Sequence, residues 1–189
     1  TATGQIAPGS YTITNSGVVE VEITSLVAFG VKISGSPPRI PVFRFAHGSY
    51  DFASFSSADL TAMWRTMSNV TGATSHAMLI ALGSNDALNG TVWSTINTNA
   101  STFLTNATAA GFLARRIAGV MPWRWSSYTT PGTSYELGVS AVRDAYDAAG
   151  VKIINTDGVD FVAEYAGDGH PPPAGHARVT SIIAESLSH

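Results

Sequence analysis

A short segment near the C-terminus places an acidic and a basic side chain one residue apart. The run Gly167-Asp168-Gly169-His170-Pro171 is rich in Gly and Pro and therefore predicts a loop. Packing does not require an Asp and a His in such a loop, whereas a catalytic dyad does. The carboxylate can orient the imidazole, and the imidazole can act as a general base. The segment thus predicts acid–base chemistry by Asp168 and His170.

A second polar segment, Leu82-Gly83-Ser84-Asn85-Asp86, ends an apolar run in mid-chain. A side-chain amide at such a strand end can stabilise the negative charge that develops on an attacked carbonyl oxygen. Gly-Ser-Asn-Asp is also ordinary turn chemistry. Its occurrence together with the His170 loop favours the catalytic interpretation for Asn85.

These segments resemble the conserved blocks of SGNH (GDSL-type) hydrolases, and the resemblance covers residues 40–187. Gly83-X-Asn85-Asp86 matches the third block of that family, and His170 with the following Pro171 and Ala174-Gly175-His176 matches the final block. The resemblance implies that Asn85 donates to the oxyanion and that His170 is the base. The segment before Asn85 also resembles the second block of the family, which implies that Gly48 is the oxyanion-hole glycine and Ser49 a bystander. The family places its Asp three residues before the His, whereas Asp168 lies two residues before it.

The nucleophile departs from the family pattern. No Gly-Asp-Ser occurs, and the segment 29–35, which resembles the first block in outline, has Lys32 where the serine would stand. Ser49 follows a predicted strand and a glycine, so we expect its hydroxyl to be the nucleophile. Ser34 and Ser10 are alternatives, and so is a site without a serine. A domain without the serine would be an inactive module that binds glycans or proteins. A third, less favoured interpretation is that the chain is a structural appendage of a larger fibre.

Aromatic side chains follow one of the predicted strands. Trp123 and Trp125 begin a loop, where indole rings can stack on sugar rings, line an acyl pocket or simply cover the sheet. We take them as candidate substrate-binding residues. Trp64 and Trp93 lie within helical patterns, which predicts that both belong to the core.

Strands and helices alternate from residue 40 onwards. The pattern predicts strands over 40–46, 76–82, 114–121 and 151–155, and helices that start at 56 or 57 and span 91–110, 134–149 and 174–187. This alternation predicts an α/β three-layer sandwich with a mostly parallel sheet. Active sites in such sheets lie beyond the carboxyl ends of the strands. Ser49, Asn85 and His170 all follow strands, so we expect them to share one site.

The first 36 residues have a different pattern. Apolar and polar residues alternate on both sides of the turn Asn15-Ser16-Gly17, and Gly35-Ser36-Pro37-Pro38 then interrupts the pattern. The sequence therefore predicts a β-rich N-terminal extension over 1–36 and an SGNH-like α/β domain over 37–189.

Composition limits the partners. Charged residues make up 12% of the 189 residues, about half the usual share, which suits an extracellular or virion-associated protein. A net charge of -3 with few Lys and Arg argues against nucleic-acid binding, and no apolar run is long enough for membrane insertion. There is no Cys, and the five His have no ligand spacing, so no metal or cofactor is expected. The expected partner is a small ester or an acylated glycan, and the sequence sets no oligomeric state.

Overall fold

The computed structural model describes residues 45, 49–122, 134–156 and 173–187. All of them except Phe45 belong to one compact unit, Ala46–His189. The predicted N-terminal extension, its boundary after residue 36 and nearly all of the strand predicted over 40–46 lie outside the described residues. These three expectations therefore stay predictions.

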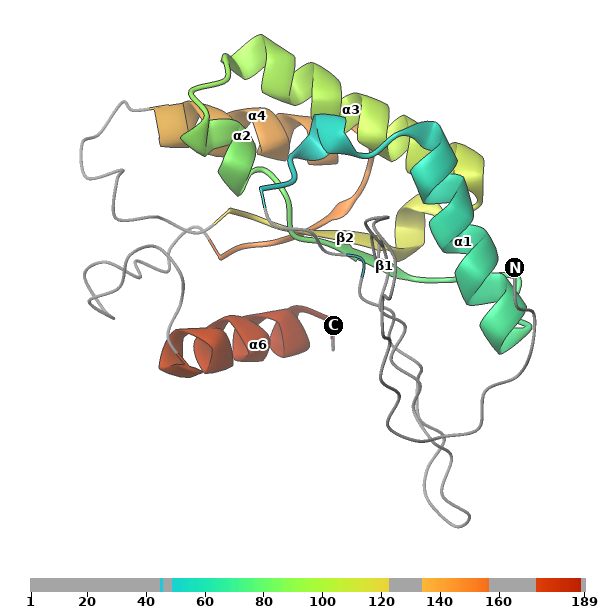
Figure 1. Cartoon of the computed structure of the whole chain (residues 1–189). Coiled ribbons are helices and arrows are strands. Elements are labelled where there is room, and N and C mark those ends of the chain that lie inside the picture. The colour runs from blue at the N-terminus through green and yellow to red at the C-terminus, as the bar shows by residue number, and fades with distance from the viewer. Residues whose placement is uncertain (1–44, 46–48, 123–133, 157–172, 188–189) are drawn as a thin grey trace, which may run out of the picture. The chain divides into compact units, whose positions relative to one another are not determined.

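In the described part of the chain, three parallel strands form the sheet. They are β1 (Met78–Ile80), β2 (Ile117–Val120) and β3 (Lys152–Ile154), in the order β1-β2-β3. Met78 pairs with Ile117, and Ala118 pairs with Lys152. Every residue of the central strand is buried, as expected for a strand that is covered on both faces. The carboxyl ends of all three strands therefore lie at one edge of the sheet, shown in Figure 1.

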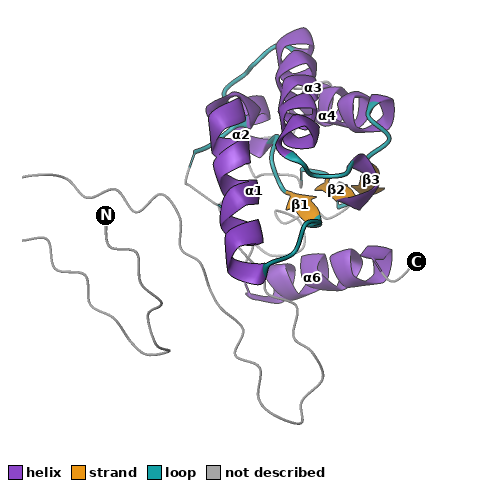
Figure 2. Cartoon of the chain, turned by 90° about the vertical axis from the view of Figure 1, so that its right-hand side faces the viewer, coloured by secondary structure: helices purple, strands orange, loops and turns teal. Residues whose placement is uncertain are grey.

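Helices cover both faces of this sheet (Figure 2). On one face lie α1 (Ser57–Thr71), α3 (Trp93–Ala110) and α4 (Ser134–Ala148), which share the main hydrophobic core with β1 and β2. On the other face, α6 (Pro173–Leu187) packs Ile182 and Ile183 against a smaller cluster of Ala118, Val120 and Ile154. The described part of the chain thus confirms the predicted α/β three-layer arrangement with a parallel sheet.

Local sequence signals set the ends of several helices. Ser56 is the N-cap of α1, and its hydroxyl and the carboxylate of Asp59 form a reciprocal capping box. Beyond α4, Gly150 adopts a left-handed backbone with φ of +64°, which ends the helix before β3. These two signals are why the helix boundaries agree closely with the predicted ones.

The two tryptophans predicted for the core differ. Trp64 is half-buried and packs against the main core, with its ring 5.8 Å from that of His76. Trp93 is 39% exposed, so the prediction for this residue was wrong. It shares the helix face of the buried Ile96 and Ala100, but it is the first residue of α3 and is not covered as they are.

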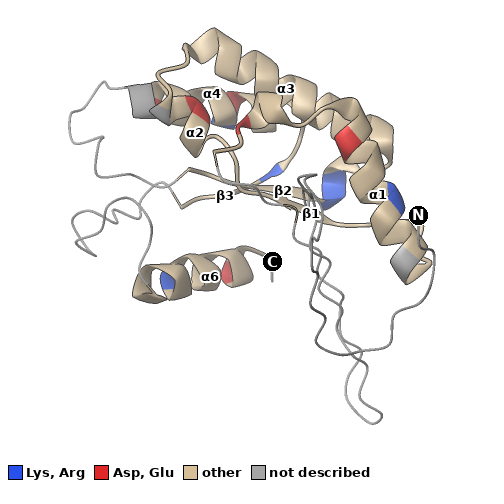
Figure 3. Cartoon of the chain, in the orientation of Figure 1, with Lys and Arg blue, Asp and Glu red and all other residues tan. Residues whose placement is uncertain are grey.

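Charged residues are sparse on this framework (Figure 3). Apart from the adjacent Arg115 and Arg116, the Lys and Arg residues of the described ranges lie on different elements: Arg65, Arg143, Lys152 and Arg178. None of the helices in this part of the chain is long and apolar enough to span a bilayer.

Candidate active site at the carboxyl end of the sheet

Asn85 lies on the short helix α2 (Ser84–Leu88), just beyond the carboxyl end of β1 (Figure 1). The helix begins after Gly83, whose φ is +105°. A Cβ on Gly83 would lie 2.9 Å from Cγ2 of Val142 and 3.0 Å from Cγ of Pro122. Only glycine therefore allows both this backbone conformation and the close approach to α4 that places Asn85 here.

The Asn85 amide is held in place by the main chain of Tyr50. Its Nδ2 donates a hydrogen bond of 2.8 Å to the Tyr50 carbonyl oxygen. A side-chain amide carries two N–H groups, and this bond uses one of them. The other N–H can be donated to a developing oxyanion, which is the role that the sequence predicts for Asn85.

Ser49 directly precedes the residue that Asn85 binds. Its side chain is exposed, and its φ of +65° makes it the one non-glycine residue with positive φ among the described residues. A left-handed backbone costs a non-glycine residue about 1–2 kcal/mol, so neighbouring contacts must maintain it. The structure thus places Ser49 one residue before the carbonyl that Asn85 binds, and the nucleophilic role of Ser49 stays a prediction.

A short helical turn, η1 (Phe52–Ser54), continues from this serine. The carboxylate of Asp51 accepts the Ser54 amide at 2.9 Å and the Ser54 hydroxyl at 2.6 Å. The rings of Tyr50 and Phe55 meet edge to face at 5.3 Å. The segment 49–55 is therefore held by its own local contacts as well as by α2.

Asp86 is a buried carboxylic acid beside Asn85, with 1% of its surface exposed. Its Oδ2 accepts the Phe52 amide at 3.3 Å, and its Oδ1 has no hydrogen-bond partner among the described residues. Burial raises the pKa of Asp86 from 3.8 to about 6; the Phe52 amide lowers it in part and the charge of Asp51 raises it further. No role was predicted for Asp86 from the sequence, although it directly follows Asn85 there.

Tyr146 of α4 is the second buried polar group in this region. Its ring lies 6.4 Å from that of Phe52, and its hydroxyl has no partner among the described residues. Burial and the charge of Asp86 both raise the pKa of Tyr146. A Cβ on Gly119 would collide with this ring, so the glycine in β2 makes room for Tyr146.

The remaining predicted site residues lie outside the described residues: Gly48, Trp123, Trp125, Asp168 and His170. The described chain stops at the carboxyl ends of β2 and β3, at Pro122 and Thr156. These two ends lie side by side, because the Thr156 hydroxyl donates to the Met121 carbonyl and the Met121 amide donates to the Ile154 carbonyl at 2.9 Å. The described chain therefore ends before residue 123 and before residue 157 at the edge at which Asn85 lies.

A serine–histidine contact also exists at the other end of β1. Ser68 Oγ and His76 Nε2 are 2.8 Å apart, and His76 is buried and precedes β1. This pair connects α1 to the amino end of a strand. It therefore lies away from the carboxyl edge of the sheet, where Asn85 binds the Tyr50 carbonyl.

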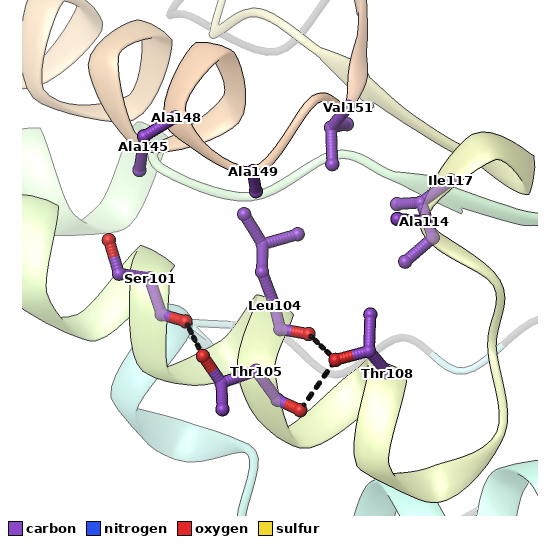
Figure 4. A pocket seen from close by; sticks show the side chains of 10 residues that line it. All are labelled: Ser101, Leu104, Thr105, Thr108, Ala114, Ile117, Ala145, Ala148, Ala149 and Val151. Carbon is purple, nitrogen blue, oxygen red and sulfur yellow. Dashed lines mark hydrogen bonds between the residues drawn. The ribbon is translucent and has the colours of Figure 1, made fainter.

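A groove of about 350 Å³ lies between α3 and α4 (Figure 4). Its lining includes Leu104, Ile117 and Val151 and contains no titratable side chain. The hydroxyls of Thr105 and Thr108 donate to carbonyl oxygens of α3 itself, at 2.9 and 3.1 Å. The groove lies by the amino ends of β2 and β3 and has no group for acid–base chemistry.

Metal ligands do not gather in the described ranges: no three His, Asp or Glu side chains there could hold a metal ion. The chemistry available at the carboxyl edge among the described residues is that of a hydroxyl, an amide and one buried carboxyl group.

Comparisons with known proteins identify the fold. No protein-family model matches the sequence, and no curated protein matches it. Solved structures do match. A lipase/acylhydrolase from Enterococcus faecalis has a TM-score of 0.51 and 15% identity, covering 70% of this chain and 70% of that one. A member of the lipolytic protein G-D-S-L family from Veillonella parvula has a TM-score of 0.50 and 18% identity, covering 71% and 76%.

The esterase EstA from Pseudoalteromonas sp. is similar to the same extent, with a TM-score of 0.51 and 16% identity over 71% of this chain and 72% of that one. At such identities the likeness concerns the fold. It confirms the predicted resemblance at that level: this chain has an SGNH-like α/β fold.

Proposed function

We propose that the protein is a serine esterase that acts by two-step acyl transfer at the carboxyl edge of the sheet. The observation that carries this proposal is the Asn85 amide, which is held by the Tyr50 carbonyl directly beside the exposed Ser49. The structures with the same fold are described as lipolytic enzymes and esterases, which supports an ester as the substrate.

In the proposed reaction, the Ser49 hydroxyl attacks the ester carbonyl while His170 accepts the hydroxyl proton and Asp168 orients the imidazole. Asn85 and the backbone amides near Gly48 stabilise the oxyanion. The tetrahedral intermediate then collapses, and the alcohol leaves with the proton from His170. Water, activated by His170, attacks the acyl-serine and releases the acid.

The substrate class that we propose is an acylated carbohydrate, with deacetylation as the reaction. The low share of charged residues suits an extracellular or virion-associated protein that meets glycans, and Trp123 and Trp125 offer rings that can stack on sugars. Release of acetate from O-acetylated xylan oligosaccharides, compared with simple aryl esters, tests this class. Wild-type turnover on aryl esters with none on the glycans would contradict it.

The activity itself is tested with p-nitrophenyl acetate and butyrate on the wild type, Ser49→Ala and His170→Ala. Removal of a member of a catalytic triad lowers kcat by several orders of magnitude. The matched controls are Ser181→Ala and His176→Ala, because both residues are exposed on α6 and neither has a role in the proposed reaction. Loss of turnover in both site variants, with both controls active, supports the proposal.

One sequence feature favours a second function. Lys32 stands where the first block of the family has its serine, as in a domain that binds glycans or proteins without catalysis. A fluorophosphonate probe distinguishes the two functions because it labels activated serines. Labelling at Ser49 supports the esterase. A folded protein with no label and no turnover, but with retention on a glycan array, supports the binding module.

A further inference from the structure

We propose that Asp86 is a positioning residue of the candidate site: its carboxylate holds the Phe52 amide and so keeps the Ser49–Tyr50 backbone against the Asn85 amide. The inference deepens the proposed esterase function and rests on it.

Helix α2 makes two hydrogen bonds with one short segment, residues 50–52. Asn85 donates to the carbonyl of Tyr50, and Asp86 accepts from the amide of Phe52. The first bond holds the carbonyl of the residue before Asp51, and the second holds the amide of the residue after it. Helix α2 donates in the first bond and accepts in the second. A backbone segment held at a carbonyl and at a following amide cannot rotate about either contact alone, so the pair sets its orientation toward α2.

Burying the Asp86 carboxyl group in this place costs free energy. Asp86 is 1% exposed, its Oδ1 has no partner among the described residues, and the negative charge of Asp51 acts on it unfavourably. Among the described residues, the other titratable group that interacts with Asp86 is Tyr146 of α4, which carries no compensating positive charge. An apolar residue would avoid the cost of burying this group. A role for the bond to Phe52 explains why a carboxyl group is placed here.

The bond between Asp86 and the Phe52 amide can affect the reaction through the position of Ser49. Ser49 has a left-handed backbone that its neighbours must maintain, and the Phe52 amide lies three residues further along the chain. When this amide is released, the segment can relax and Ser49 can move relative to the oxyanion donor of Asn85. A misplacement of about 1 Å can cost about a hundredfold in rate, without a change in substrate affinity.

The test compares Asp86→Ala, which removes the acceptor, with Asp86→Asn, which retains an oxygen that can accept the Phe52 amide. The matched control is Asp59→Ala. Asp59 also accepts a backbone amide at a helix start, that of Ser56 at 2.8 Å, but it acts on the cap of α1. Two readouts are measured for each: kcat and KM on p-nitrophenyl acetate, and the hydrogen-exchange rate of the Phe52 amide.

For Asp86→Ala we expect a kcat about 10- to 100-fold lower, with KM changed less than threefold, and Phe52 exchange at least about tenfold faster. Asp86→Asn should restore kcat to within about threefold of the wild type, and Asp59→Ala should leave kcat and Phe52 exchange unchanged. An Asp86→Ala protein with wild-type kcat, or with equally slow Phe52 exchange, overturns the inference.

The two proposals fail in different ways. If the wild type hydrolyses no ester, the esterase proposal fails, while Phe52 exchange still reports whether Asp86 holds the segment. If the wild type is active and Asp86→Ala is equally active, only the positioning role fails. If Asp86→Ala does not fold, the wild type alone decides: a Phe52 amide that exchanges as fast as an exposed loop amide overturns the inference.

Discussion

At the scale of single residues, Asp86 makes the stability of the protein depend on pH. Its pKa is raised from 3.8 to about 6 in the folded state, so the folded state favours the protonated form. Stability should therefore be highest below about pH 4 as far as this group is concerned, and should be lost as the pH rises through 6. The loss is on the order of 3 kcal/mol, since one pKa unit corresponds to about 1.4 kcal/mol.

Urea unfolding of the wild type and Asp86→Asn between pH 4 and 8 measures this effect. Because Asn does not titrate, the wild type should lose stability relative to the variant as the pH rises over this range. A difference between the two proteins that stays constant with pH would contradict the assigned pKa.

The hydroxyl of Tyr146 gives a second prediction at this scale. It is buried without a partner among the described residues, whereas the ring packs beside Phe52 and over Gly119. Tyr146→Phe keeps the ring and removes the unpaired group. We expect the free energy of unfolding to stay the same or to rise by about 1 kcal/mol, measured by urea unfolding. A fall of more than about 1 kcal/mol would mean that the hydroxyl has a hydrogen-bond partner.

The limits of prediction are visible at the same scale. The sequence indicates that Asn85 and Ser49 each end a strand, because polar residues follow apolar runs at both places. It does not indicate that Asn85 binds the Tyr50 carbonyl or that Asp86 binds the Phe52 amide. Those bonds join residues far apart in the chain, and they depend on how α2 packs against α4.

At the scale of elements, α2 depends on the glycine before it. Gly83→Ala combines a positive φ with contacts of 2.9 and 3.0 Å to Val142 and Pro122. We expect it to destabilise the protein by about 2–4 kcal/mol and to lower any esterase activity, because Asn85 lies two residues further on. Gly90→Ala is the matched control, because Gly90 has a φ of +67° and open space around it.

Thermal unfolding and ester turnover of both glycine variants measure the difference. Gly90→Ala should cost only about 1–2 kcal/mol, from backbone strain alone, and should leave turnover unchanged. Equal losses for the two variants would show that the contacts of Gly83 with α4 do not matter.

Elements were predicted well wherever the signal is local. The capping box at Ser56 and the left-handed Gly150 are set by residues within one turn, so they appear directly in the sequence. The helical pattern predicted that Trp93 is buried. Such a pattern gives the face of a helix but not which residues of that face are covered by other elements. Its exposure at the start of α3 therefore required the structure.

At the scale of the whole unit Ala46–His189, α6 provides the third layer. Ile182 and Ile183 pack against Ala118, Val120 and Ile154 on a sheet face that the other described helices do not share. Ile183→Asp places a charge against this apolar cluster, and we expect a loss of at least about 2 kcal/mol in urea unfolding. Ser181→Asp, at an exposed position of the same helix, should change stability by less than about 0.5 kcal/mol. Similar losses for both would argue against α6 as a packed layer.

The parallel pairing of the strands has a consequence for how the protein folds. Met78 pairs with Ile117, and Ala118 pairs with Lys152, so each pair of strands forms only after the chain has closed over an intervening helix. Closing such long loops costs entropy before any strand contact repays it, and folds rich in such contacts reach the native state slowly. Helices α1 and α3 can form within microseconds, whereas β2 pairs with its two neighbours only after both loops have closed, so we expect this pairing to be slow. Until it is complete, β2 exposes its apolar residues and its unpaired backbone, which favours aggregation.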